Sequence, residues 1–310
     1  MVKGSCPPST TGRGVERVQG AEAERGRPRV AAGPGAAGRH QPVRRFASVA
    51  VVPKRSIWHL YRRPSRDSIL PMSRESLPQG VVLVHGLWGV PEDWTWVRRE
   101  LERRRPDVQV EVPDLPSHRL PDAGLLADAV EVREAIVAIP APTVVVGWSY
   151  GTDVVGLAAH GMPNVARLVY VSSPPIKAQP DERDASYVDT MEHMLRDEHG
   201  RFALDGDWWL NEDDAGRRLA DEVRASLKEH PRRYATKKTR TDPVPAEAWR
   251  EIPTTVLLGA RDNLTGADQR AWAREAVADV RDIDTDHFAL FNLPELVAEV
   301  ILEPLLGPAR

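Results

Sequence analysis

The sequence predicts an α/β fold: an open, mostly parallel sheet of about six strands, with helices on both faces and a helical lid inserted late in the chain. Two observations support this prediction. Short apolar runs alternate regularly with amphipathic stretches from residue 79 onward, and repeated β–α units imply parallel pairing with right-handed crossovers. The first of these runs, Val81 to Val84, is apolar throughout, as is typical of a strand buried on both faces of a parallel sheet.

The predicted strands are short segments, of which the first is wholly apolar. The first consists of Val81, Val82, Leu83 and Val84, and the third ends in three consecutive valines. The predicted strands cover residues 81–84, 108–112, 143–146, 166–171, 254–258 and 279–283.

The predicted helices lie between these strands. Pro91 suits the first turn of a helix, where its missing N–H costs nothing, and residues 122–137 place Leu125, Leu126, Ala129 and Val130 on one side. The later helical stretches follow the third, fifth and sixth strands. The predicted helices cover residues 91–103, 122–137, 151–160, 267–276 and 294–301.

Residues 175–250 break the alternation, with helical patches at 185–196 and 213–228 and no strand-like run. A segment inserted after a strand's carboxyl end lies over the edge where open α/β sheets bind ligands. We therefore expect a helical lid within an α/β domain of residues 72–310. The alternative is a peripheral decoration with no role in binding.

Residues 1–71 differ in composition from the rest of the chain. They carry 14 Lys and Arg against 4 Asp and Glu, whereas residues 72–310 carry 28 and 41. Their Arg, Pro and Gly content predicts a disordered basic extension. Met72 is a candidate for the natural first residue of the protein. Residues 1–71 would then be an over-extension of the sequence at its start. The alternatives are a targeting segment, for which Arg44-Arg45-Phe46 is a faint export signal, and a tail that binds nucleic acid or anionic lipid.

The overall composition excludes several classes of protein. The net charge of −3 and the lack of like-charge blocks argue against a nucleic-acid partner. No apolar run approaches the ~20 residues of a membrane span. The one cysteine, Cys6, cannot form an internal disulfide, and zinc-ligand spacing is absent. We expect a cytoplasmic protein without cofactor or metal, and the sequence leaves its oligomeric state open.

A serine turn follows the third predicted strand. Gly147-Trp148-Ser149-Tyr150-Gly151 lies between a buried valine run and a helical stretch, which is the context that a nucleophile elbow requires. The glycines allow close approach of neighbouring strands, and the Ser149 hydroxyl projects at the positive end of the next helix. Ser149 is the predicted nucleophile.

The loop after the first strand supplies the predicted oxyanion site. It reads His85-Gly86-Leu87-Trp88-Gly89, and a tetrahedral oxyanion needs preorganised N–H donors. We expect these donors to be the backbone N–H groups of Leu87 and Tyr150. His85 is expected to brace the loop.

Two strand ends near the carboxyl terminus supply the remaining catalytic candidates. Asp262 follows one late strand and His287 follows the next, and the chain order Ser149, Asp262, His287 is the order expected for this fold. His287 would take the serine proton, and Asp262 would fix its tautomer. Asp284 and Asp286 compete for the acid role, but they lie too close to His287 in sequence.

Several motifs resemble a known family: Val-Leu-Val-His-Gly at 82–86, Pro-Asp-Leu-Pro at 113–116, Gly-Trp-Ser-Tyr-Gly at 147–151, Leu-Val-Tyr-Val at 168–171 and Ala-Trp-Arg-Glu-Ile-Pro at 248–253. With them, residues 79–307 resemble the α/β-hydrolase superfamily, and more narrowly its small serine esterase and hydroxynitrile-lyase-like branch. Members of that branch begin almost directly at the oxyanion strand, which favours Met72 as the start. The sequence departs from the branch at Trp148, where histidine is common, at Thr152, where glycine is frequent, and at Ser117, which replaces the glycine of Pro-Gly-His.

The nucleophile narrows the expected chemistry. Serine suits acyl transfer through an acyl-enzyme, so we expect a carboxylesterase-like hydrolase that acts on a small lipophilic ester. Carbon–carbon bond hydrolysis and cyanohydrin cleavage remain alternatives on the same triad. Cyanohydrin cleavage would need a lysine from Lys177, Lys228, Lys237 or Lys238. A non-catalytic ligand-binding role is a further alternative. The predicted substrate-binding residues are Trp88, Trp148, Trp208 and Trp209.

Overall fold

Six parallel strands form the central sheet, which confirms the predicted fold class. The computed structural model describes residues 75–178, 181 and 183–306. The strands follow the order β3-β2-β4-β5-β8-β9, so the sheet is open and its strand order reverses beside β2. Their bounds are β2 Gly80–Val84, β3 Gln109–Glu111, β4 Thr143–Trp148, β5 Val165–Val171, β8 Thr254–Gly259 and β9 Asp279–Ile283.

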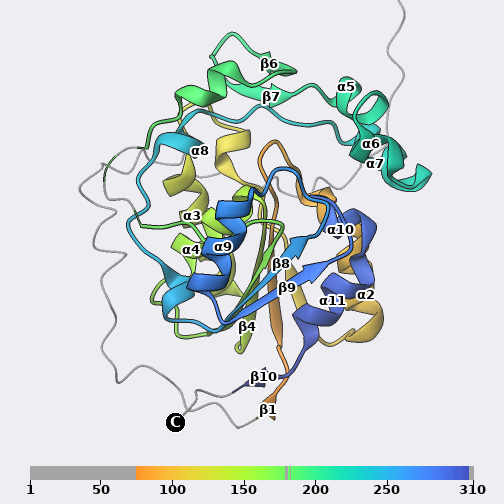
Figure 1. Ribbon diagram of the computed structural model, residues 1–310. Helices are drawn as coiled ribbons and strands as arrows, with labels where there is room; N and C mark the ends of the chain where they lie inside the picture. Colours follow the sequence, from red (N-terminus) through yellow and green to blue (C-terminus); the bar gives the residue numbers. More distant parts are fainter. Residues whose placement is uncertain (1–74, 179–180, 182, 307–310) are drawn as a thin grey trace, which may run out of the picture. The chain divides into compact units, whose positions relative to one another are not determined.

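Helices cover both faces of this sheet (Figure 1). One face carries α3 (Leu125–Ala138), α4 (Tyr150–Ala158) and α9 (Ala267–Ala276), and the other carries α2 (Thr95–Arg104), α10 (Ala289–Asn292) and α11 (Pro294–Leu302). Successive strand residues point to opposite faces. Val82 and Val84 therefore pack in the first core, and Val81 and Leu83 pack in the second.

The local sequence accounts for where several of these elements begin. Pro91 opens a 3₁₀ turn, Pro91–Trp94, which leads into α2, so the helix predicted at 91–103 is divided.

A short antiparallel ribbon pairs β1 (Glu75–Ser76) with β10 (Leu305–Leu306). Within the described ranges, no helix is long and apolar enough to cross a membrane. The extension predicted at residues 1–71 lies outside the described residues.

The segment between β5 and β8, residues 172–253, is called the insertion below. It contains α5 (Gly206–Asn211), α6 (Asp214–Arg218), α7 (Asp221–Glu229) and α8 (Lys238–Thr241). It also contains an antiparallel hairpin of β6 (Met194–Arg196) and β7 (Phe202–Leu204). The expectation of a wholly helical lid was therefore incomplete. The helix predicted at 185–196 is a 3₁₀ turn, Ser186–Thr190, followed by β6.

A polar turn explains this difference. The Asp197 side chain accepts hydrogen bonds from the backbone N–H groups of His199 and Arg201, and Gly200 has a φ of 70°. Asp side chains favour such turns, and glycine adopts positive φ at little cost. The turn reverses the chain and brings β7 against β6. Asp213 likewise caps α6, so the second helical patch begins as a separate short helix.

The insertion has a small apolar cluster of its own, made of Ala185, Val188 and Phe202. Leu87, Trp88 and Met194 pack against this cluster. A buried ion pair also ties the insertion to the domain, because the Arg232 guanidinium bonds the Asp93 carboxylate, with one contact of 2.9 Å. The insertion therefore packs against the loop that follows β2.

Candidate active site

Ser149 occupies a strained turn between β4 and α4. Its φ of 53° and ψ of −122° lie outside the ordinary regions for a non-glycine residue. A Cβ at Gly147 would collide with the Gly151 backbone, and a Cβ at Gly151 would collide with the Val84 carbonyl oxygen. The Ser149 N–H donates to the Val171 carbonyl at 2.9 Å. The turn thus has the geometry that the sequence predicts for a nucleophile elbow.

Asp262 and His287 meet where the loops after β8 and β9 lie side by side. His287 Nδ1 lies 2.9 Å from Asp262 Oδ2, which also accepts from Thr265 Oγ1 at 3.0 Å. Asp262 Oδ1 accepts the Leu264 N–H at 2.8 Å. Burial raises the pKa of Asp262, but the hydrogen bond and charge of His287, with the other two donors, lower it below its usual value.

The two competing carboxylates lie elsewhere. Asp284 is exposed and pairs with Arg261. Asp286 Oδ1 accepts the Phe288 N–H at 3.0 Å and the Asn292 side-chain amide at 2.9 Å. Only Asp262, of the three, is bonded to the imidazole of His287.

Trp148 connects the serine turn to His287. Its indole Nε1–H donates to the His287 carbonyl oxygen at 2.9 Å, and its ring centroid lies 5.9 Å from that of His287. A histidine at this position has a smaller ring and could not span the same gap while packing against Phe288 and Phe291. The departure at Trp148 therefore has a structural role, which is to fix the backbone that carries His287.

The loop after β2 leaves the Leu87 N–H without a hydrogen-bond partner among the described residues. The Trp88 N–H donates to His118 Nε2 at 2.9 Å, and the Gly89 N–H donates to the Gly86 carbonyl at 3.1 Å. In the part of the chain that the structure describes, the Leu87 N–H, which precedes both, forms no hydrogen bond. The Tyr150 N–H is the first of α4 and has no partner within that helix. These are the two N–H groups expected from the sequence.

A cavity of about 510 Å³ lies at this edge of the sheet, and both Ser149 and His287 line it. Both expected oxyanion residues, Leu87 and Tyr150, line it too. The insertion and the loop after β5 supply much of the wall. The apolar lining residues include Ile176, Val188, Met191, Phe202, Leu204, Leu264, Trp272 and Phe288, which the sequence analysis did not single out.

Three of the four tryptophans expected to contact substrate line this cavity: Trp88, Trp148 and Trp209. Trp208 does not. It stacks on His193, with ring centroids 3.7 Å apart, while Trp209 packs against Phe288. Adjacent residues on α5 point about 100° apart, because a helix has 3.6 residues per turn. The expectation for Trp208 is therefore corrected.

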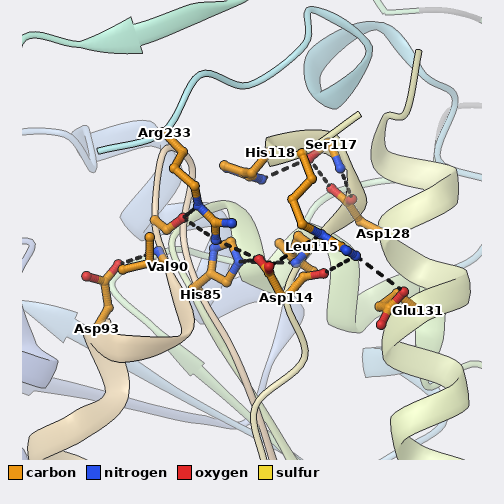
Figure 2. A network of polar contacts seen from close by, with 12 residues as sticks. His85, Val90, Asp93, Asp114, Leu115, Ser117, His118, Asp128, Glu131 and Arg233 are labelled. Atoms are coloured by element: carbon orange, nitrogen blue, oxygen red, sulfur yellow. Dashed lines mark hydrogen bonds and ion pairs between the residues drawn. The ribbon is translucent and has the colours of Figure 1, made fainter. Parts of the chain in front are cut away.

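His85 is buried and braces the loop rather than facing the cavity. Its Nδ1 lies 3.0 Å from the Gly86 carbonyl, and its Nε2 accepts the Leu115 N–H at 3.3 Å (Figure 2). Burial lowers the pKa of His85 to about 4, so the ring is neutral at pH 7. No group of acidic, histidine and cysteine side chains in the described ranges is arranged to hold a metal ion.

A buried carboxylate, Asp128 on α3, was missed by the sequence analysis. Its Oδ1 accepts the Ser117 N–H at 2.8 Å, and its Oδ2 accepts Ser117 Oγ at 2.6 Å and the Tyr150 hydroxyl at 2.7 Å. Figure 2 shows Asp128 facing Ser117 beside His118. The signal was present in the replacement of glycine by Ser117, because a hydroxyl enclosed there needs a partner.

Burial raises the pKa of Asp128 to about 7, against the hydrogen bonds from Ser117 and Tyr150 and with the nearby charge of Asp242. The folded state therefore binds this proton more tightly than the unfolded state, and the associated stability is lost as pH rises toward 7. Between pH 5 and pH 8, the free energy of unfolding should fall by about 2–3 kcal/mol more in wild type than in Asp128→Asn. Urea unfolding at both pH values measures this difference, and equal pH slopes would contradict it.

Comparisons with known proteins agree with this fold. Residues 81–300 match the alpha/beta hydrolase family. A search of curated proteins finds no match.

Solved structures similar to this chain include an extracellular α/β-hydrolase from a Paenibacillus species that shares structural and functional homology with tobacco salicylic acid binding protein 2. It is 19% identical, with a TM-score of 0.58, over 75% of this chain and 100% of that one. A pyrethroid hydrolase from Sphingobium faniae JZ-2 is 17% identical, with a TM-score of 0.52, over 72% and 95% of the two chains. Tomato methylketone synthase I, complexed with 2-tridecanone, is 15% identical, with a TM-score of 0.55, over 73% and 97%.

At these identities the structural likeness shows the fold alone. The family match spans the strand of the oxyanion loop, the serine turn and the loops that carry Asp262 and His287. This chain belongs to the alpha/beta hydrolase family.

Proposed function

We propose that this protein is a serine hydrolase that cleaves a carboxylic ester of a small lipophilic substrate through an acyl-enzyme. One observation carries the proposal. Ser149, in its strained turn, lines the same cavity as His287, and the far side of the His287 imidazole is bonded to Asp262 at 2.9 Å.

The proposed reaction has two acyl-transfer steps. His287 Nε2 takes the Ser149 proton as Oγ attacks the ester carbonyl, and the resulting oxyanion accepts the Leu87 and Tyr150 N–H groups. The imidazolium then gives its proton to the departing alcohol, which leaves an acyl group on Ser149. Water, deprotonated by His287, attacks this acyl group and releases the carboxylic acid and free Ser149. Asp262 keeps the Nδ1 proton directed away from Ser149 throughout.

The wall of the cavity supports a lipophilic substrate. Leu87, Val188, Phe202, Leu204, Trp209 and Phe288 line it, together with the charged side chains of Asp153, Lys177, Arg232 and Arg240. The Sphingobium structure is that of a pyrethroid hydrolase, and the tomato structure holds 2-tridecanone. Both are in keeping with apolar ligands on this fold.

The cytoplasmic location of the protein stays a prediction.

A second candidate function is cyanohydrin cleavage, which a specific lysine favours. Of the four lysines considered, Lys177 lines the cavity, with Nζ 3.9 Å from the ring centroid of Trp272. Lys237 pairs with Asp189. Lys238 donates to the Asp122 carbonyl, and Lys228 lines a different depression. Release of cyanide from mandelonitrile, abolished in Lys177→Ala, would favour this function over ester hydrolysis.

The test of the proposed function is hydrolysis of p-nitrophenyl esters, from acetate to decanoate, by wild type and Ser149→Ala. Turnover that requires Ser149, with a maximum at one chain length, supports an esterase with a cavity of defined size. Activity that survives in Ser149→Ala would overturn the nucleophile. If no ester is hydrolysed but cyanide release or carbon–carbon cleavage is detected, the result would favour one of these two reactions, catalysed by the same three residues.

Trp209→Ala should change the chain-length profile. Its ring lies 4.8 Å from that of Phe288 in the cavity wall, so its removal enlarges the cavity beside Phe288. We expect kcat/KM for the preferred ester to fall about 10-fold, with a smaller change for the acetate. Trp208→Ala is the matched control, because its ring stacks on His193 outside the wall. Equal effects of the two variants, or an unchanged profile, would contradict this role.

A further inference from the structure

A directed chain of hydrogen bonds links the loop after β2 to Asp128. The Trp88 N–H donates to His118 Nε2 at 2.9 Å, so the ring proton of neutral His118 lies on Nδ1. This Nδ1 is 3.0 Å from Ser117 Oγ, which therefore accepts there and donates its own proton to Asp128 Oδ2 at 2.6 Å. Every donor in the chain points toward the carboxylate.

The chain depends on a neutral His118. Burial lowers the pKa of His118 well below its usual value, and the neighbouring His85, Arg233 and Arg232 act in the same direction. A protonated ring could not accept the Trp88 N–H. The tautomer and the direction of each bond are thus set by the surroundings.

A second link joins the same carboxylate to the serine turn. The Tyr150 hydroxyl donates to Asp128 Oδ2 at 2.7 Å, and Tyr150 immediately follows Ser149. Tyr150 is 3% exposed and Asp128 is fully buried. One carboxylate oxygen therefore receives both the hydroxyl from the serine turn and the hydroxyl that ends the chain from Trp88.

These two links end beside the two backbone donors of the proposed oxyanion site. Trp88 follows Leu87 and has a φ of 63°, a costly conformation for a bulky residue. Its N–H is held by His118, and its carbonyl accepts the Arg233 N–H at 2.9 Å. The hydrogen bond from the Trp88 N–H fixes the Leu87–Trp88 peptide, and the Leu87 N–H lies only two backbone torsions before that peptide, so the fixed peptide limits where the Leu87 donor can point.

We propose that Asp128 is a positioning residue that fixes the backbone N–H groups of Leu87 and Tyr150 relative to each other. It acts on Leu87 through Ser117 and His118, and on Tyr150 through the Tyr150 hydroxyl. The inference rests on the proposed function and deepens it. It also gives a reason for two side chains of this sequence, Ser117 and Tyr150, that a glycine and a phenylalanine could replace sterically but not chemically. A merely structural carboxylate would hold these elements together without affecting the stabilisation of an oxyanion.

The test compares wild type with Ser117→Ala, Tyr150→Phe and Asp128→Asn, and Ser117→Thr serves as a rescue that keeps the hydroxyl. The matched control is Tyr170→Phe, since the buried Tyr170 hydroxyl has no hydrogen-bond partner among the described residues. Each protein is assayed for kcat and KM on a p-nitrophenyl ester. It is also assayed for inhibition by a trifluoromethyl ketone, which forms an oxyanion on serine, and for binding of the matching methyl ketone, which does not.

Misplacing an oxyanion donor costs less than removing it, so we expect kcat to fall about 10-fold in Ser117→Ala and Tyr150→Phe and about 100-fold in Asp128→Asn. KM and methyl ketone affinity should stay within about twofold. The inhibition constant of the trifluoromethyl ketone should rise by the same factors as kcat falls. Tyr170→Phe should match wild type, and Ser117→Thr should recover most of the loss.

Variants that lower the melting temperature without changing kcat or trifluoromethyl ketone inhibition would overturn the inference. A parallel loss of methyl ketone affinity would also overturn it, because that pattern reports a reshaped cavity. Reaction of wild type with a fluorophosphonate separates the two proposals. If the protein is labelled at Ser149 but hydrolyses no ester, the proposed esterase activity alone is overturned. The trifluoromethyl ketone series then still decides the role of Asp128. A chain that reacts with neither probe overturns both.

Discussion

Ser149→Ala is expected to lower kcat for a p-nitrophenyl ester by about 10⁴- to 10⁶-fold, because no acyl-enzyme can form without the hydroxyl. The residual rate would come from substrate binding and the oxyanion donors. The alanine inherits the φ of 53° at this position. The fold should therefore be as stable as in wild type. Steady-state hydrolysis, with active-site titration of wild type, measures the effect.

Ser172→Ala is the matched control for this variant. Ser172 is buried, has a φ of 61° and follows β5, the strand next to β4, so the same substitution is made in the same kind of backbone. Its hydroxyl has no hydrogen-bond partner in the described ranges. We expect kcat within about twofold of wild type. Comparable losses in the two variants would show that the turn, and not the nucleophile, had been disturbed.

Asp262→Asn should lower kcat by about 10⁴-fold with little change in KM. The Asp262 carboxylate accepts from His287 Nδ1 at 2.9 Å and so leaves Nε2 free to accept the serine proton. An asparagine amide facing Nδ1 can donate to it, which places the ring proton on Nε2 and removes the base. The loss of carboxylate charge also removes stabilisation of the imidazolium. Kinetics between pH 6 and pH 10 would measure both effects.

Asp284→Asn is the control for this second variant, since its carboxylate is exposed and paired with Arg261. We expect its kinetics to match wild type. Retention of more than about a tenth of wild-type kcat in Asp262→Asn, or an equal loss in Asp284→Asn, would contradict the assignment of the acid.

The central strands of the sheet, such as β2 and β4, could be predicted from the sequence because they are buried on both faces. Such strands are apolar throughout. In a sequence in which apolar runs alternate with helical stretches, a run such as Val144 to Val146 therefore predicts a buried parallel strand. The strand bounds Asp279–Ile283 and the helix bounds Ala267–Ala276 were predicted to the residue. The open parallel fold is accordingly confirmed by the structure and by the family match.

The insertion was harder to predict because its elements are short. β6 and β7 have three residues each, too few to show a period of two, and their pairing depends on the turn at Asp197 and Gly200. The distinction between Trp208 and Trp209 likewise depends on where α5 begins, which the Asp205 cap determines. A shift of one residue would exchange the two indoles.

The candidate site was partly predictable for a related reason. The carboxyl ends of parallel strands share an edge of the sheet. Because Ser149, Asp262 and His287 each follow a predicted strand, the sequence alone predicts that they lie at the same edge. Asp128 could not be found in this way. It lies in the first turn of a helix, and its partners, Ser117 and Tyr150, belong to two other elements that only the packing of α3 brings together.

The small apolar cluster of Ala185, Val188 and Phe202 gives the insertion an interior separate from the two cores of the sheet. Val188 and Phe202 also line the cavity. Substitutions that resize this part of the wall therefore act on a local interior, whereas the residues around Ser149 depend on the sheet. Leu87 and Trp88 pack against the same cluster, so directed evolution of substrate range through Val188 and Phe202 would leave the loops of Asp262 and His287 untouched but would also act on the loop after β2.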